Sequence, residues 1–296
     1  MVMEKRYSTG IVFSGGGTKA AAHCGALQAL EEYGIRPDVM AGTSAGSLVA
    51  AFYSAGFSPV EMIDLFIGMN FFRDIVTPAA PKGGFFNSRP LVKYIREVMP
   101  YRNIEELPVP VYIAASDMDN GRTVIFSEGE LAPRLVASCS IPVVFQPMVI
   151  DGVHYIDGGV FMNLPVPAIR PMCDKVIAIS VRQVGPEKYR DNVMHVASRA
   201  YEMMFMANII EDARLADTYI DLDTSSFSVY DISNVVKLFR LGYDTTCKAL
   251  EQQGYVRVME ARKVEFRPAG AGQKGLSPFE KYRNNIQRAL NRMRRV

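Results

Sequence analysis

The stretch "IVFSGGGTKAAAHCGAL" (Ile11–Leu27) decides the fold class and frames the functional question. A short apolar run, typical of a buried strand, ends in three consecutive glycines, and apolar residues then recur at helical spacing up to Gly34. A glycine-rich turn between a strand and a helix presents backbone N–H groups at a helix N-terminus. Such a turn can hold a phosphate, a dinucleotide or a developing oxyanion. The rest of the sequence has to distinguish these ligands.

The composition is that of an ordinary globular protein. The chain has 296 residues, is 49% hydrophobic and has a net charge of +2, which gives no indication of nucleic-acid binding. Because no Pro/Gly/Ser-rich linker divides it, we expect a single domain over residues 1–296, with core motifs in 8–181 and a helical C-terminal portion in 191–296. Four widely spaced cysteines indicate free buried thiols, and three histidines without metal-ligand spacing indicate no metal site.

The N-terminal sequence "MVMEKRYSTG" does not have the pattern of a signal peptide, because Glu4 interrupts it and the apolar run that follows is too short. No stretch reaches the roughly 20 apolar residues of a membrane-spanning helix. We therefore expect a cytoplasmic protein, with peripheral membrane contact argued below from the C-terminal segment.

Strand and helix patterns alternate along the chain. After the first strand and helix, residues 38–44 predict a second strand, residues 45–56 a second helix, and Ser58-Pro59-Val60-Glu61 the capped start of a third helix. Asp151-Gly152 predicts a hairpin turn, and residues from about 192 to 215 predict a long, Met-rich helix. Strands are also expected at 109–117 and 122–129, and a further buried strand at 175–181. Strands that alternate with helices predict an α/β fold with parallel strand pairing.

The second predicted strand runs into Gly42-Thr43-Ser44-Ala45-Gly46, a G-x-S-x-G sequence at a strand-to-helix turn. A nucleophilic serine has to project from a sharp turn, which strains its backbone. The flanking Gly42 and Gly46 tolerate unusual backbone angles and leave room for the helix to pack beneath the strand. A small-residue turn without chemistry is the alternative, but the context on both sides favours Ser44 as a nucleophile.

A serine hydroxyl is a weak nucleophile without a base. His154 stands three residues before Asp157 in "HYIDGG", but on a strand these two side chains point to opposite faces. His23 and His195 have no catalytic context. The alternative base is Asp157, which ends a predicted strand just before Gly158-Gly159, and burial beside the serine would raise its pKa. For Asp157-Gly158-Gly159 taken alone, an ordinary turn is the simpler explanation.

Acyl transfer also needs N–H donors for the oxyanion of the tetrahedral intermediate. Gly15, Gly16 and Gly17, next to Thr18 at a helix N-terminus, offer several such groups. Lys19 either adds positive potential beside them or lies in solvent in the first helical turn.

Three motifs in this order resemble the patatin-like phospholipase family in its bacterial form. They are "SGGGTKAAAHCGALQALEEYGI", "DVMAGTSAGSLVAAFYSAG" and "ASCSIPVVFQPMVIDGVHYIDGGVFMNLPV". The resemblance extends from about Ser8 to about Val181, with a weaker echo at Leu241–Leu250. It implies a three-layer α/β/α sandwich with a central, mostly parallel sheet. It also implies hydrolysis of acyl esters of phospholipids, lysophospholipids or neutral lipids, without a metal or an organic cofactor.

The resemblance assigns roles by position. Ser44 would be the nucleophile and Asp157 its partner in a Ser–Asp dyad, with Gly15, Gly16 and Gly17 as the oxyanion hole. Asn163 and Pro165 would complete the family pattern D-G-G-x-x-x-N-x-P. One departure is Ala20, which stands where the last glycine of the family's G-G-G-x-R/K-G loop is expected, and we expect little effect on the donors.

Other functions fit parts of the same pattern. Gly15-x-Gly17-x-x-Ala20 matches a dinucleotide fingerprint, but the acidic residue required at the end of the second strand is absent, and no G-x-x-x-x-G-K-[ST] sequence occurs. We therefore expect no nucleotide ligand. An acyltransferase that uses the same acyl-enzyme, or a non-catalytic lipid-binding protein, remains an alternative to a hydrolase.

Three apolar segments bear on lipid binding. Paired phenylalanines in "MNFFRDI" (69–75) and "GGFFNS" (83–88) fall in or near loops between helices, as core residues or as an acyl-binding flap. The Met-rich run 201–210 is core or channel lining. In residues 279–296, apolar residues fall on one helical face and basic residues on the other, which indicates a surface helix or one attracted to anionic lipid.

Overall fold

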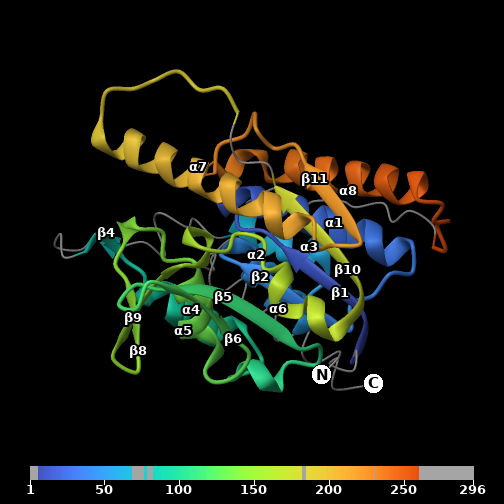
Figure 1. Cartoon of the computed structure of the whole chain (residues 1–296), viewed down its shortest axis with the longest axis horizontal. Helices are drawn as coiled ribbons and strands as arrows, with labels where there is room; N and C mark the ends of the chain where they lie inside the picture. The colour runs from blue at the N-terminus through green and yellow to red at the C-terminus, as the bar shows by residue number, and fades with distance from the viewer. Residues whose placement is uncertain (1–5, 69–76, 79–82, 182–184, 230, 260–296) are drawn as a thin grey trace, which may run out of the picture.

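The computed structural model describes residues 6–68, 77–78, 83–181, 185–229 and 231–259 (Figure 1). Within them, an eight-stranded sheet has the order β11-β10-β1-β2-β5-β9-β8, with β6 also paired to β5. The five strands from β11 to β5 are parallel. The strands are β1 (Tyr7–Phe13), β2 (Val39–Thr43), β5 (Val111–Asp117), β6 (Arg122–Phe126), β8 (Met148–Ile150), β9 (Val153–Asp157), β10 (Cys173–Val181) and β11 (Thr218–Leu222).

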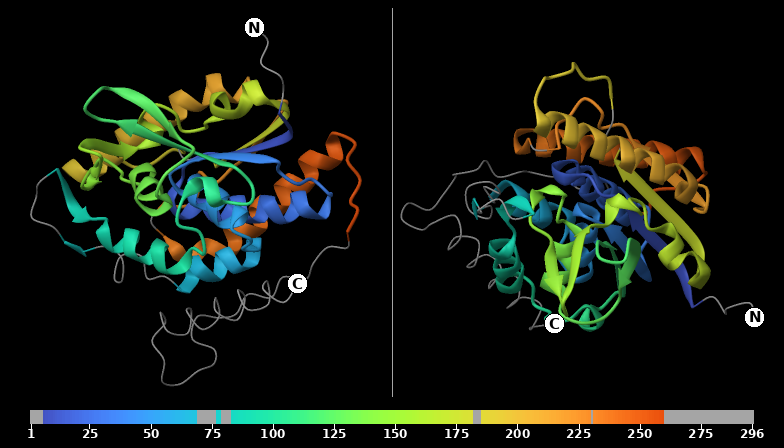
Figure 2. Two further views of the ribbon diagram at one scale, coloured as in Figure 1. Left: turned by 90° about the horizontal axis from the view of Figure 1, so that it is seen from below. Right: turned by 60° about the vertical axis from the view of Figure 1, so that its left-hand side comes forward.

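Helices cover both faces of this sheet, as the left view of Figure 2 shows. One face packs on α1 (Ala21–Glu32), α2 (Ala45–Ser54), α3 (Pro59–Gly68), α4 (Arg89–Val98), α5 (Leu131–Ser138) and α8 (Val235–Gln252). The other face packs on α6 (Val166–Ile169) and α7 (Val193–Ala213). The predicted three-layer fold with a mostly parallel sheet is therefore confirmed.

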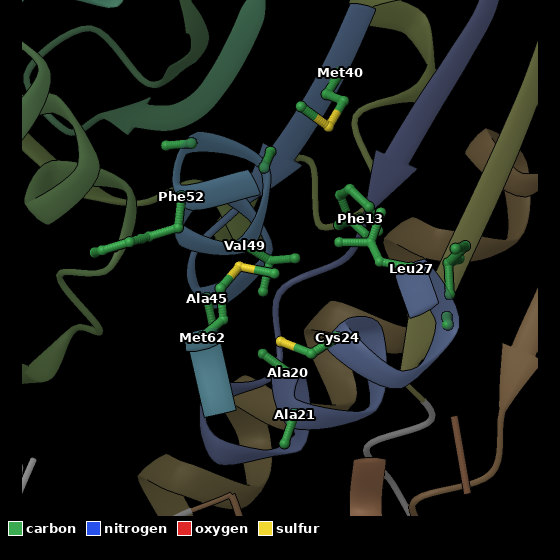
Figure 3. Packing of buried hydrophobic residues seen from close by; sticks show 14 of the residues in the cluster. Phe13, Ala20, Ala21, Cys24, Leu27, Met40, Ala45, Val49, Phe52 and Met62 are labelled. Carbon is green, nitrogen blue, oxygen red and sulfur yellow. The ribbon is translucent and has the colours of Figure 1, made fainter. Parts of the chain in front are cut away.

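Alternation along β1 shows how one strand serves both layers. Ile11 and Phe13 are buried in the larger core beneath α1 and α2, and Figure 3 shows Phe13 beside Leu27 of α1. Val12, which lies between them in the sequence, is buried in the smaller core with residues of α6 and α7. Because side chains alternate along a strand, an apolar run without alternation is the pattern of a strand covered on both faces.

The helices α1 and α8 approach closely through glycines. A Cβ atom at Gly25 of α1 would lie 1.9 Å from the carbonyl oxygen of Phe239, and one at Gly242 of α8 would lie 1.9 Å from that of Ala22. These distances exclude any larger residue, so each glycine allows the backbone of the other helix to approach. The segment Leu241–Leu250, which resembles the family more weakly, contains Gly242 and is therefore part of the core.

Several local predictions are confirmed. The Asp151-Gly152 turn joins β8 to β9, and the capping box at Ser58 has both of its hydrogen bonds, from Glu61 N–H to Ser58 Oγ and from Ser58 N–H to Glu61 Oε2.

Two expectations are corrected. The C-terminal portion is not purely helical, because β11 forms an edge of the main sheet.

The second correction concerns residues 83–88. They contain β4 (Gly84–Asn87), which pairs with β3 (Thr77–Pro78) and β7 (Val143–Phe145) in a three-stranded sheet, rather than a loop. Phe86 packs on Phe145, but Phe85 is 48% exposed and is not a core residue. The segments 69–75 and 279–296 lie outside the described residues.

Candidate active site

Ser44 occupies a sharp turn between β2 and α2. Its φ and ψ angles are 51° and −128°, a conformation that costs on the order of 1–3 kcal/mol for a residue with a Cβ. The two glycines of the motif make this turn sterically feasible. A Cβ atom at Gly42 would lie 2.5 Å from the carbonyl group of Gly46, and one at Gly46 would lie 2.5 Å from the oxygen of Ser14 in the chain after β1. The motif therefore requires glycine at both positions, because main-chain atoms approach each of them closely.

A second serine fixes this turn to the sheet. The N–H group of Ser44 donates a 2.8 Å hydrogen bond to Ser138 Oγ at the end of α5, and that hydroxyl donates a 2.6 Å bond to the carbonyl oxygen of Ala114 in β5. Ser47 Oγ, one turn into α2, donates to the carbonyl oxygen of Ser44. Ser44 itself is only 5% exposed. Its strained backbone is thus held by hydrogen bonds on both sides.

The register of β5 brings Asp157 next to this turn. Thr43, the last residue of β2, pairs with Ala114, and Asp157, the last residue of β9, pairs with Ala115. Because β6 occupies the opposite side of β5 over these positions, β9 continues on the side where β2 ends. The two catalytic candidates, 113 positions apart (157 − 44) in the sequence, are therefore brought together by consecutive residues of one strand.

Asp157 is fully buried at the start of a short turn. Its Oδ1 accepts a 2.9 Å hydrogen bond from the N–H group of Gly159, and its own N–H group donates to the carbonyl oxygen of Ser140. Burial raises the pKa of the carboxyl to about 7, and the hydroxyls of Ser44 and Tyr201 and the Gly159 N–H group act in the opposite direction. A carboxyl with this pKa can accept a proton near neutral pH.

The glycine-rich turn lies against both Ser44 and the segment after Asp157. A Cβ atom at Gly15 would lie 3.1 Å from the Cβ of Ser44 and 2.5 Å from Oδ1 of Asn163. The N–H group of Gly15 already donates to the backbone oxygen and to Oδ1 of Asn163, at 3.2 and 3.1 Å. Among the described residues, no acceptor contacts the N–H groups of Gly16 and Gly17. These two groups are the ones that remain for a ligand.

The segment after Asp157 attaches to the same end of the sheet. Thr43 Oγ1 donates a 2.8 Å bond to the carbonyl oxygen of Met162, the residue before Asn163. Pro165 stands immediately before α6, which packs on the smaller core. Asn163 and Pro165 thus have structural roles. One connects the segment to the glycine-rich turn, and the other begins the helix.

Lys19 is buried in the structure, with 1% of its surface exposed, so its alternative placement in solvent is wrong. Burial lowers its pKa to about 8, while the negative charges of Glu202 in α7 and Asp223 raise it. Both acidic residues are about 180 or more positions away in the sequence, and no local pattern indicates them. With this pKa the ammonium group is mostly charged at pH 7, and two residues after Gly17 it adds positive potential next to the glycine-rich turn.

The sequence analysis relates the Met-rich run of α7 to the core or to an acyl channel, but not to Asp157. A Cβ atom at Gly159 would lie 2.3 Å from the ring of Phe205, and that ring packs on Tyr201 with centroids 4.0 Å apart. Asn208 Nδ2 donates to the carbonyl oxygens of Gly159 and Val160. The positions 201, 205 and 208 recur at helical spacing and form one face of α7 over the aspartate turn. Apolar residues on all sides of α7 hide this spacing in the sequence.

Each histidine is engaged elsewhere. His154 Nδ1 lies 3.0 Å from Asp119 Oδ2, on a half-exposed side chain that does not approach Asp157. His23 is buried with Nε2 2.9 Å from the carbonyl oxygen of Ser14, and burial lowers its pKa to about 4, so it is neutral at pH 7. His195 lies 3.9 Å from Glu187. Within the described ranges, no cluster of three or more His, Cys, Asp and Glu side chains could hold a metal ion.

Comparison with known proteins places the chain in a family. The family model described as patatin-like phospholipase matches residues 11–169, more than half of the chain. The chain therefore belongs to the patatin-like phospholipase family, as its motifs predict. In addition, no helix in the described part of the chain is long and apolar enough to cross a membrane.

Curated relatives share the same region. The chain is 29% identical over 187 residues to an NTE family protein of Mycobacterium tuberculosis, covering 60% of this chain and 51% of the relative. It is 30% identical over 203 residues to lysophospholipase NTE1 of Mycosarcoma maydis, covering 63% of this chain and 10% of the relative. The chain thus spans about half the length of the mycobacterial relative and a small part of the fungal one.

Among solved structures, VipD from Legionella pneumophila has a similar fold. The TM-score is 0.53 at 13% sequence identity, and the match covers 84% of this chain and 67% of VipD. At this identity the similarity concerns the fold alone.

Proposed function

We propose that the protein hydrolyses carboxylic esters of phospholipids, lysophospholipids or related lipids through a Ser44–Asp157 dyad. The observation that carries this proposal is the register of β5, which holds the ends of β2 and β9 at consecutive positions. Family membership supports lipid esters as the substrate class. The fungal relative named lysophospholipase supports the same class.

In the first half of the reaction, Ser44 Oγ attacks the ester carbonyl carbon while Asp157 accepts the hydroxyl proton. The carbonyl oxygen becomes negative, and the free N–H groups of Gly16 and Gly17 stabilise it. Gly15 does not donate to the oxyanion, because its N–H group is bonded to Asn163. This bond supports the turn that carries the two donors. Collapse of the intermediate breaks the C–O bond to the alcohol, which takes the proton from Asp157 and leaves an acyl-serine.

In the second half, water attacks the acyl-serine and Asp157 accepts a proton from it. The second tetrahedral intermediate uses the same donors, and its collapse returns the proton to Ser44 Oγ and releases the fatty acid. Asp157 is suited to both steps because its raised pKa lies close to neutral pH. Lys19 contributes by its charge next to the glycine-rich turn, without contact with the reacting atoms.

The test compares two buried serines of the same segment, Ser44 at the start of α2 and Ser54 at its end. Ser44→Ala should lose at least about 1,000-fold in hydrolysis of p-nitrophenyl butyrate and of lysophosphatidylcholine. Ser54→Ala, which removes a hydroxyl bonded to Val109, should keep its activity. Free fatty acid as the product distinguishes hydrolysis from acyl transfer. Activity in a folded Ser44→Ala protein equal to that of wild type would overturn the mechanism.

We also propose that residues 279–296 bring the protein to anionic membranes. The support is the sequence alone, in which Lys281, Arg283, Arg288 and Arg292 alternate with apolar residues at helical spacing. Co-sedimentation with phosphatidylglycerol vesicles should be stronger for the full chain than for a chain truncated after Gly275. Equal binding by the two chains would contradict the proposal.

A further inference from the structure

Helix α7, which lies along the outer edge of the molecule in Figure 1, carries an exposed apolar stripe. Val193 is 82% exposed and Met203 is 58% exposed, whereas Phe205 and Ile209 on the other side of the helix are buried. The stripe consists of Val193, Val196, Ala200, Met203, Ala207 and Ile210, all of them exposed. A surface helix normally presents polar residues to solvent, so a continuous apolar stripe marks a binding surface.

The spacing within the stripe indicates that its partner is another helix. Successive members are three, four, three, four and three residues apart, which is an average period of 3.5. This period keeps a narrow row of side chains facing a second helix over several turns. A helix that lies in a lipid interface has a broader apolar face, and a basic face opposite to it. The inner face of α7 is instead occupied by its contacts with the aspartate turn.

The sizes of the side chains make the stripe complementary to a second copy of itself. When two copies of α7 lie antiparallel about a two-fold axis near position 201, each alanine of one copy faces a larger residue of the other. The facing pairs are Val196 with Ala207, Ala200 with Met203 and, at the ends, Val193 with Ile210. A parallel pair would place alanine opposite alanine and leave gaps. Self-complementarity of this kind is what a two-fold dimer requires.

Charged residues at the two ends of α7 favour the same partner. Arg190 and Asp191 are exposed just before the helix, and Glu211 and Arg214 are exposed at its end. Antiparallel packing places each end beside the opposite end of the second copy, so that Arg190 can meet Glu211 and Asp191 can meet Arg214. Because these charges balance, they do not attract an anionic membrane or complement the basic segment 279–296. A second copy is therefore the occupant that the charges fit best.

The size of the contact predicts a weak dimer. From Val193 to Ile210 the stripe is about 27 Å long, on a helix about 10 Å wide, so each copy would bury several hundred Å². Stable complexes of standard size bury about 800 Å² on each partner, and smaller contacts belong to weaker complexes. We therefore expect a dissociation constant in the micromolar range or above.

We propose that the α7 stripe is the interface of a homodimer, in which two copies of α7 pack antiparallel with Val196 of each copy opposite Ala207 of the other. The inference does not depend on the proposed function, because the stripe lies on the side of α7 that faces away from the aspartate turn. It adds an interaction surface and a partner that neither the motifs nor the family comparison assigns.

The experiment measures the mass of the full chain in solution by sedimentation equilibrium between about 1 and 200 µM. The average mass of the wild type should rise from that of one chain toward that of two. Val196→Glu should weaken association by about tenfold or more, because each dimer would bury two unpaired carboxylates. Val149→Glu is the matched control and should stay within about twofold, since Val149 is a similarly exposed valine on β8.

A second substitution tests the antiparallel arrangement. In Val196→Glu/Ala207→Lys, each glutamate would meet a lysine of the other copy, and the dissociation constant should return to within about threefold of wild type. Positions 196 and 207 of one helix are about 16 Å apart, so the two new charges do not pair within one chain. A double variant that associates no better than Val196→Glu would overturn this arrangement.

Other occupants of the stripe give different results. A wild type that remains a single chain over the whole concentration range would overturn the dimer. So would association that appears only after truncation behind Gly275, which would mean that the C-terminal segment covers the stripe. Binding of the wild type to phosphatidylcholine vesicles that Val196→Glu abolishes and the double variant does not restore would show a lipid surface instead. Circular dichroism checks that each variant is folded.

Discussion

The turn that carries Ser44 and the turn that carries Asp157 are both rich in glycine, but different groups lie against those glycines. Gly42 faces the backbone of Gly46, and Gly46 faces the carbonyl oxygens of Phe13 and Ser14. Gly159 instead faces the ring of Phe205 in α7. The glycines of the serine turn therefore meet main-chain atoms within 46 residues of the N-terminus. The aspartate turn meets the main chain of β5 at Gly158 and a side chain of a distant helix at Gly159.

The largest expected effect distinguishes Asp157 from the histidine beside it in the sequence. Asp157→Asn should lower kcat for p-nitrophenyl butyrate by about 10³-fold, because the amide cannot accept the proton from Ser44. His154→Ala should stay within about twofold of wild type, because its ring pairs with Asp119 on the surface. A folded His154→Ala protein as inactive as Asp157→Asn would show that the histidine is the base.

The next prediction compares the glycines by stability. Gly46→Ala should lower the free energy of unfolding by about 3 kcal/mol, since its Cβ meets carbonyl oxygens that cannot move independently of the sheet. Gly159→Ala should cost about 1–2 kcal/mol, because an aromatic ring can shift. Urea denaturation followed by circular dichroism measures both.

A second substitution sharpens this contrast. In the Gly159→Ala background, Phe205→Leu should restore about 1 kcal/mol of the free energy of unfolding, which a double-mutant cycle measures as a favourable coupling. Phe13→Leu should show no such coupling with Gly46→Ala, because Gly46 meets the Phe13 oxygen and not its ring. Equal coupling in the two cycles would remove the distinction between the two sides.

Asp157 also makes stability depend on pH. Its pKa in the folded protein, about 7, is above the ordinary value of 3.8, so the stability that protonation contributes is full below pH 3.8 and is lost as the pH rises through 7. Asp157→Asn removes this loss, and its Tm should exceed that of wild type by about 2–5 °C at pH 8.5 and by less at pH 5. A difference in Tm that is the same at both pH values would contradict the burial argument.

The smallest effect concerns α7 and the pH profile. Activity of the wild type should rise with an apparent pKa near 7, as Asp157 ionises. Tyr201→Phe removes a hydroxyl that favours the ionised form, so the midpoint should move to higher pH by about 0.5 unit. Phe205→Leu is the control for packing on the same face and should leave the midpoint in place. A Tyr201→Phe profile that matches the wild type would limit α7 to a structural role.

The difference between contacts within a turn and contacts with a distant helix also explains which parts of the site the sequence could predict. The serine turn, the glycine-rich turn and the aspartate turn are each contiguous and marked by glycines. Local patterns together with the family resemblance therefore predict Ser44, Asp157 and the order of the elements. The buried Lys19 is compensated by the charges of Glu202 and Asp223, which only the fold brings near. The contribution of Tyr201, Phe205 and Asn208 was hidden because α7 has apolar residues on all sides.

Residues 83–88 illustrate another limit. A strand of four residues with glycine at its start has no pattern that distinguishes it from a loop, and its pairing with β7 is set by residues about 60 positions later. Likewise, the sequence offered Gly15 as an oxyanion donor, and only the structure shows that its N–H group is already bonded to Asn163.

The pairing of Thr43 and Asp157 with consecutive residues of β5 has a consequence for engineering. The spacing of the two catalytic candidates depends on one strand, and not on the length or continuity of the chain between them. The turns at Gly121 and Gly152, where an added Cβ would meet nothing within 4 Å, have open space around them. A circularly permuted chain with new ends at either turn should therefore retain the dyad, provided that β9 still pairs with β5.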